Sequence, residues 1–130
     1  MLFRSNENKK RSIAFKSLGQ LRYLSALKYM DLVLGNSSSG ILEVPSFNIP
    51  TINIGDRQKG RILSESVIQT EPNSSDLSQS FAKATDPSYL KKIKNQKQLY
   101  GSGNTAKKIM SILRHQTDND LKKTFHDIQF

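Results

Sequence analysis

The sequence contains no cysteine among its 130 residues. Neither a disulfide framework nor a thiolate metal site can therefore form, and a reducing compartment is compatible with the chain. No run of apolar residues approaches the roughly 18 that are needed to cross a membrane. The basic opening, MLFRSNENKKRSIAF, has no continuous apolar segment of the kind that a secretory signal requires. We therefore expect a soluble, cytoplasmic protein with no membrane partner.

Apolar residues are also scarce. Hydrophobic residues make up 35% of the chain, and adding the 7 glycines still leaves the apolar share below the usual value of about 45–50%. A length of 130 residues corresponds to one domain or part of one, because domains usually hold roughly 100–200 residues. The composition therefore predicts a modest core.

Aromatic residues do not alternate with the basic blocks of the chain. Lys and Arg number 20 against 11 Asp and Glu, a formal net charge of +9, and such an excess is typical of proteins that bind phosphate backbones. The cations are scattered, however, and single-strand binders normally combine cations with aromatic stacking platforms. Blocks of this kind usually form solvated helix faces. We therefore expect no nucleic-acid partner.

Short apolar runs alternate with helical patterns along the chain. Strands are predicted at 32–34, 50–54 and 66–70. Because short loops separate them from helical segments, the pattern is typical of βαβ units with a parallel sheet. The triplet Leu32-Val33-Leu34 lacks polar alternation, which predicts a strand buried on both faces. The predicted fold class is α/β, a Rossmann-like parallel sheet with flanking helices.

Helical periodicity and capping residues predict the segments between and after these strands. Leu21, Leu24, Leu27 and Met30 recur at three-residue spacing, which predicts one buried helix face. Pro45 interrupts a short helix over 40–47. The remaining helices follow capping signals: one after the turn at 71–75, one with Pro87 at its first position, one beginning at Asn104 or Thr105, and an amphipathic stretch over 121–128.

A serine loop, Gly35 to Gly40, follows the first predicted strand. Ligands of open α/β sheets bind beyond the carboxyl ends of the strands. Backbone N–H groups at a helix start, with the hydroxyls of Ser37, Ser38 and Ser39, would suit phosphate oxygens, and Gly40 would let a ligand approach the backbone. An ordinary serine N-cap would explain the same residues. The loop has neither a Walker A motif nor a G-x-G-x-x-G fingerprint, which favours a nucleotide other than ATP or NAD.

Glu43 follows the serine loop by one turn. We expect it near the first turn of the short helix, where the helix dipole favours a carboxylate. A capping box does not account for it, because residue 40 is glycine rather than serine or threonine. A carboxylate in this place can accept hydrogen bonds from a ribose diol, as the acidic residue of dinucleotide folds does.

Three cations, Arg57, Lys59 and Arg61, alternate in the loop after the second predicted strand. An extended backbone would direct all three to one side. The planar guanidinium of Arg57 suits phosphate, although a solvated turn cation is the plainer alternative.

These motifs closely resemble the hydrolysing UDP-N-acetylglucosamine 2-epimerases, and above all the members of that family in sialic acid pathways. The resemblance is carried by GNSSSGILEVPSF at 35–47 and PTINIGDRQKGR at 50–61. FKSLG at 15–19, YGSGN at 100–104 and the ending FHDIQF are similar in order and approximate spacing. The likeness covers nearly the whole chain after residue 12.

The resemblance implies a glycosyltransferase-B-type fold of two Rossmann-like halves with the UDP-sugar between them. It implies elimination of UDP from UDP-N-acetylglucosamine and then hydration to N-acetylmannosamine, with no cofactor and no metal. Ser37 and Ser38 would contact the diphosphate, Glu43 the ribose hydroxyls and Arg57 the nucleotide side of the site. The backbone of Leu18 would meet the uracil.

The acid/base carboxylates of the family lie in its amino-terminal half, and this chain resembles only the carboxyl-terminal portion. We therefore assign no catalytic residue here, and expect a chain that binds UDP or UDP-N-acetylglucosamine but is inactive alone. Its partner would be the missing half or a second copy. A stand-alone UDP-sugar-binding or regulatory module is the alternative. The predicted organisation is a polar, frayed amino terminus (1–12), a partial Rossmann-like UDP-binding domain (13–115) and a helical tail (116–130).

Overall fold

The computed structural model describes residues 12–101 and 103–115. The predicted amphipathic stretch at 121–128, the tail at 116–130 and nearly all of the predicted amino-terminal segment lie outside the described residues. The described chain divides into two compact units between Tyr100 and Gly101, and each unit is described by itself. The predicted domain boundaries at 12 and 115 stay predictions.

The first unit is built on a sheet of three parallel strands, β1 (Val33–Gly35), β2 (Thr51–Ile54) and β3 (Val67–Thr70). The strands lie in the order β1-β2-β3. Gly35 pairs with Asn53 and Ile54 with Thr70, so all three strands end at the same edge. The predicted α/β fold with a parallel sheet is confirmed.

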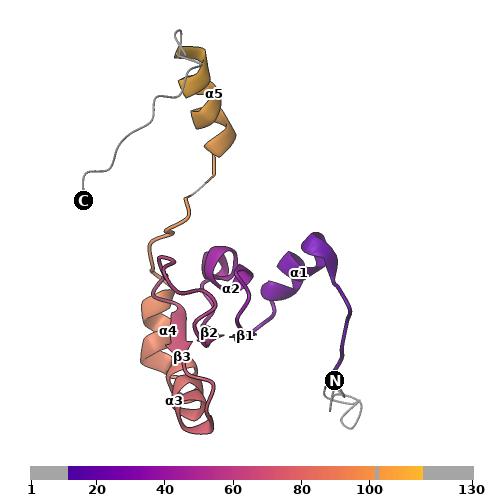
Figure 1. Cartoon of the computed structure of the whole chain (residues 1–130), viewed down its shortest axis with the longest axis vertical. Helices are drawn as coiled ribbons and strands as arrows, with labels where there is room; N and C mark the ends of the chain where they lie inside the picture. Colours follow the sequence, from indigo (N-terminus) through magenta and orange to yellow (C-terminus); the bar gives the residue numbers. More distant parts are fainter. Residues whose placement is uncertain (1–11, 102, 116–130) are drawn as a thin grey trace, which may run out of the picture. The chain divides into compact units, whose positions relative to one another are not determined.

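Helices precede, connect and follow the strands (Figure 1). The sequence signals for the later helices are confirmed: the side chain of Asn73 caps one helix, and Asp86 caps the next, which has Pro87 in its first turn. The helices of the first unit are α1 (Gly19–Leu27), α2 (Ser39–Leu42), the 3-10 helix η2 (Val44–Phe47), α3 (Ser74–Ala84) and α4 (Pro87–Ile93). The second unit contains α5 (Thr105–His115).

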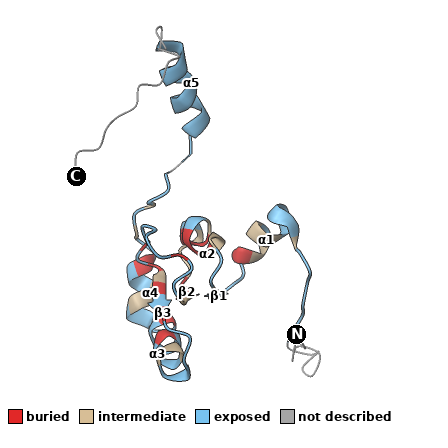
Figure 2. Ribbon diagram, viewed as in Figure 1, coloured by how far each residue is buried: buried red, intermediate tan, exposed pale blue. Residues whose placement is uncertain are grey.

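The core lies between the sheet and α3. Ile52 is fully buried and packs with Ile68 and Ala84, and Leu77 covers the edge of this cluster. Figure 2 shows buried residues on the strands and on the helices beside them, whereas the described residues of α5 are all exposed. The core is therefore modest, as the composition predicts.

Two burial predictions are wrong. Leu34 is 46% exposed, although its apolar triplet predicted a strand buried on both faces. Side chains of a strand project from the faces of the sheet, so the exposure of Leu34 means that the described elements only partly cover its face of β1, an outermost strand of the described sheet. In α1, Leu27 is buried but Leu21 is 81% exposed, and the helix ends before Met30. Periodicity shows which residues share a face, and a packing partner decides whether that face is buried.

Gln96 connects the end of α4 to the segment that follows the serine loop. Its Nε2 donates to the carbonyl oxygen of Pro45 over 2.9 Å, and its Oε1 accepts from the backbone N–H of Ser66 over 3.0 Å. These bonds hold η2 against the start of β3. No helix of the described residues is long and apolar enough to span a membrane.

Tyr89 should make the folded state sensitive to alkaline pH. Its Oη donates a 2.8 Å hydrogen bond to the carbonyl oxygen of Glu65, and burial, with the Glu65 charge, raises the pKa of Tyr89 to about 12. A folded-state pKa above the unfolded value of about 10 means that stability is intact below pH 10 and falls as pH rises toward 12. We expect Tyr89→Phe to lose less stability than the unaltered chain as pH rises. The measurement is the free energy of unfolding of both proteins in urea across pH 9–12. Parallel pH profiles would contradict the assignment.

Candidate functional site

The carboxyl ends of the three strands lead into three loops on one edge of the sheet. The loops cover residues 36–38, 55–66 and 71–73, after β1, β2 and β3 respectively. This edge is where open α/β sheets bind their ligands, and three of the five predicted site residues, Ser37, Ser38 and Arg57, lie on the first two loops.

Asn36 and Gln58 tie the first two loops together. The side chain of Gln58, which is only 6% exposed, donates from Nε2 to the carbonyl oxygen of Asn36 over 2.8 Å. Arg57 Nη1 lies 3.5 Å from Asn36 Oδ1 and donates a long hydrogen bond to it. The guanidinium of Arg57 is thereby held beside the residue that precedes Ser37.

The three serines have different roles. Ser39 begins α2, and its Oγ shares a 2.5 Å hydrogen bond with Tyr23 Oη of α1. Ser38 is the N-cap residue, but its hydroxyl makes no capping bond, so an ordinary N-cap does not explain it. The hydroxyl of Ser37 accepts a single long bond of 3.4 Å from the N–H of Ser39. Within the described chain, Ser37 and Ser38 therefore retain hydrogen-bonding capacity that Ser39 has used.

Gly40 has a different role from the predicted one. It is buried, and a Cβ added to it would lie 2.7 Å from the Cγ2 atom of Thr51 on β2. The close neighbour of this backbone is therefore the second strand, not a ligand. The glycine allows α2 to pack directly on the sheet, which fixes the position of the serine loop.

Glu43 lies at the other end of α2 from the predicted one. It is the C-cap residue of α2 and the N-cap residue of the four-residue helix η2, and its side chain makes no capping hydrogen bond. The side chain is half-buried, and it makes no hydrogen bond or ion pair with another described residue. The carboxylate is therefore free to accept hydrogen bonds from a ligand.

The prediction that Arg57, Lys59 and Arg61 share one side is wrong. The backbone turns here instead of extending: the N–H of Lys59 donates to the carbonyl oxygen of Asp56 over 2.8 Å, and that of Arg61 to Gln58 over 3.2 Å. Arg57 faces Asn36, whereas Lys59 and Arg61 line a separate pocket at the end of β3.

Leu18 directly precedes α1 and is half-buried. The hydrogen bond between Tyr23 and Ser39 connects α1 to the serine loop, but no hydrogen bond among the described residues joins Leu18 to the polar candidates. Its role stays a prediction. Sequence reasoning missed Asn36 and Gln58, since nothing in the pattern marks Gln58 as buried. Among the described residues, no group of three or more acidic or histidine side chains could hold a metal ion.

Comparison with known proteins identifies the family. The family model described as UDP-N-acetylglucosamine 2-epimerase matches residues 1–114. The GDP/UDP-N,N'-diacetylbacillosamine 2-epimerase (hydrolyzing) of Campylobacter jejuni is 48% identical over 77 residues, which are 59% of this chain and 20% of that protein. The polysialic acid biosynthesis protein P7 of Escherichia coli is 34% identical over 108 residues, 82% of this chain and 28% of that protein.

A third relative, the UDP-N-acetylglucosamine 2-epimerase of Neisseria meningitidis, is 41% identical over 59 residues, which cover 45% of this chain and 16% of that protein. The chain thus spans 16–28% of the length of these relatives. The family model covers most of the chain, and it includes the motifs at 35–47 and 50–61 that carried the sequence resemblance, whereas the ending FHDIQF lies beyond it. The chain belongs to the UDP-N-acetylglucosamine 2-epimerase family.

Proposed function

We propose that this chain is the UDP-binding, carboxyl-terminal part of a hydrolysing UDP-N-acetylglucosamine 2-epimerase with a glycosyltransferase-B-type fold, acting in the cytoplasm. The observation that carries the proposal is the contact of Arg57 and Gln58 with Asn36. It places a guanidinium beside Asn36, the residue that directly precedes Ser37 and Ser38, at the carboxyl edge of a parallel sheet. Such an arrangement suits a diphosphate, because charge-assisted hydrogen bonds from arginine and neutral donors converge on it.

Each polar residue has a role in this proposal. Ser37 and Ser38 donate to the diphosphate oxygens, and Arg57 neutralises part of their charge. Glu43, whose carboxylate has no partner among the described residues, accepts hydrogen bonds from the ribose hydroxyls. The backbone at Leu18 contacts the uracil.

We assign the elimination and hydration steps to a larger assembly. Both steps need proton transfer by groups within hydrogen-bond reach of the sugar, and the chain corresponds to at most 28% of the length of its three relatives described above. Among the described strands, β1 pairs with β2 alone and its Leu34 is 46% exposed, so this end of the sheet offers a surface where the rest of the enzyme or a second copy can pack. We expect the 130 residues alone to bind UDP without releasing N-acetylmannosamine.

Calorimetric titration with UDP tests the site. We expect Arg57→Gln and Glu43→Gln each to weaken UDP binding by about 10-fold or more, because a hydrogen bond to a charged group contributes about 1.5–3 kcal/mol. Arg114→Gln in α5 is the matched control, since it makes the same chemical change at an exposed position of the second unit.

The control should bind UDP as the unaltered chain does. Unchanged affinity in both site variants would remove the site assignment. An equal loss of UDP affinity in Arg114→Gln would mean that Arg57 acts only through general charge attraction.

A further inference from the structure

A second pocket lies beside the proposed nucleotide site. It has a volume of about 380 Å³, within the range of roughly 300–1,000 Å³ of small-molecule sites. The turn after β2 contributes Asp56, Lys59 and Arg61, and the end of β3 contributes Glu71. We call this the turn pocket.

The four charged groups of the turn pocket are unpaired. Two are cationic and two anionic, so their formal charges cancel. Nevertheless, no ion pair or side-chain hydrogen bond joins any of them to a described residue. Opposite charges that line one pocket without pairing leave both donors and acceptors available to a ligand.

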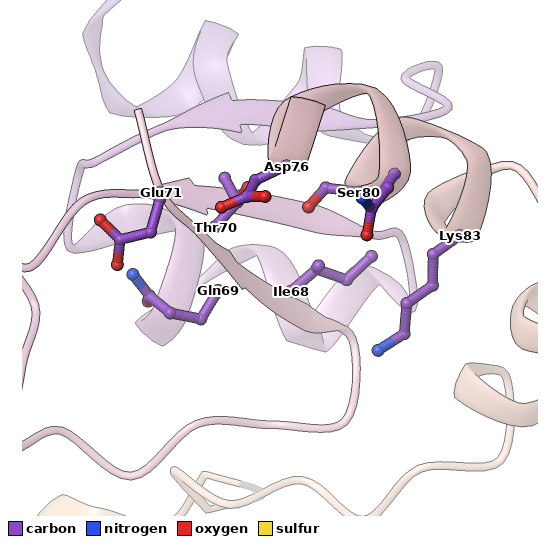
Figure 3. A pocket seen from close by; sticks show the side chains of 8 residues that line it. Ile68, Gln69, Thr70, Glu71, Asp76, Ser80 and Lys83 are labelled. Carbon is purple, nitrogen blue, oxygen red and sulfur yellow. The ribbon is translucent and has the colours of Figure 1, made fainter. Parts of the chain in front are cut away.

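Gln58 connects the turn pocket to the nucleotide site. Its Nε2 is bonded to Asn36 beside the serine loop, and the same side chain lines the turn pocket. Its Oε1 accepts no hydrogen bond from a described residue. Gln69, which also lines the turn pocket, is fixed by a 2.7 Å bond from Asn53 Nδ2 and by a bond to the carbonyl oxygen of Gly55. Figure 3 shows the side chains of Gln69 and Glu71 next to one another at the end of β3.

The larger pocket in Figure 3 is a weaker candidate. It has a volume of about 430 Å³ and runs along β3 and α3. Two of its three charged groups are already engaged, since Asp76 Oδ2 accepts a 2.9 Å bond from Asn73 Nδ2 and Lys83 Nζ lies 5.6 Å from the centre of the Tyr89 ring; the third, Glu71, is shared with the turn pocket. It also lacks a connection to the serine loop like that of Gln58.

The geometry points to the turn pocket as the subsite for the N-acylated sugar ring of the nucleotide sugar, an inference that rests on the proposed function. A second phosphate does not suit the pocket, because the carboxylates of Asp56 and Glu71 would repel it. A neutral ring with hydroxyl and amide groups matches the mixture: its hydroxyls donate to the carboxylates, and its carbonyl accepts from Lys59 or Arg61. The charged residues of the turn pocket then bind the sugar ring, whereas Ser37 and Arg57 bind the nucleotide.

The test compares two ligands on the same proteins. Affinities for UDP and for UDP-N-acetylglucosamine are measured by calorimetry with the whole chain and with Arg61→Gln, Glu71→Gln and Lys59→Gln. We expect about a 10-fold loss for the nucleotide sugar and less than a 2-fold change for UDP. All three side chains are exposed, and circular dichroism checks that each variant folds. If one variant does not fold, the conclusion is drawn from the other two.

A second measurement locates the ring directly. In ¹H–¹⁵N spectra, the side-chain amide signals of Gln58 and Gln69 should shift further with UDP-N-acetylglucosamine than with UDP. Equal losses for both ligands in the pocket variants, or no loss for either, would overturn the subsite. A chain that fails to bind UDP at all would overturn the proposed function itself. If UDP binding depends on Arg57 but the affinity for UDP-N-acetylglucosamine is unchanged in Arg61→Gln, only the subsite is overturned.

Discussion

Replacing Ile52 by alanine is expected to lower the free energy of unfolding by about 2–5 kcal/mol. Ile52 is fully buried at the centre of the sheet and contacts the core residues Ile68 and Ala84. The loss combines the transfer free energy of the removed methyl and methylene groups with the cavity left behind. Since small domains have about 5–15 kcal/mol in total, this single change should remove a large part of the stability of the first unit.

Urea unfolding followed by circular dichroism measures this effect. Ile62→Ala is the control, because this substitution removes the same atoms from a side chain that is 72% exposed. We expect the control to stay within about 0.5 kcal/mol of the unaltered chain. Similar losses in the two variants would mean that Ile52 does not occupy a packed core.

Gly40→Ala is expected to destabilise the first unit by about 1–3 kcal/mol through overpacking. The added Cβ would lie 2.7 Å from Thr51 Cγ2, and Thr51 is itself only 2% exposed. A short, β-branched side chain on a central strand cannot swing aside. In an open helix the same substitution would stabilise by up to about 1 kcal/mol, so the sign of the effect identifies the contact.

A double variant separates the contact from other causes. Thr51→Ser removes the Cγ2 atom and keeps the hydroxyl. In that background, Gly40→Ala should become neutral or slightly stabilising, which a double-mutant cycle of urea unfolding measures. If the penalty of Gly40→Ala is the same in both backgrounds, the close approach of α2 to β2 is not its cause.

In the proposed binding site, the close approach of α2 to β2 also positions the serine loop. The helix starts directly after Ser38, so its packing on β2 fixes where the serine loop lies relative to the sheet. We therefore attribute the glycine of this motif to packing of the scaffold, with an indirect effect on the ligand. The sequence pattern contained the residue but suggested the wrong partner for it.

Strand positions and helix starts were predictable because they depend on local signals. Apolar runs bounded by turn residues marked β2 and β3, and the caps at Asn73 and Asp86 marked α3 and α4. Burial was less predictable. Leu34 looks like a core residue in the sequence, yet it is 46% exposed, and no local pattern reports which elements pack on the faces of a strand.

The sequence by itself determined the fold class, the family and the set of polar residues around the serine loop, because periodicity, turn chemistry and motif order are properties of neighbouring residues. Tertiary structure alone decided which of those residues are free. It engaged Ser39 with Tyr23, joined Gln58 to Asn36 across 22 positions of the chain, and separated Arg57 from Arg61. Such contacts depend on how strands and turns are placed in space, and on the angle at which a loop leaves its strand, which short-range patterns do not encode.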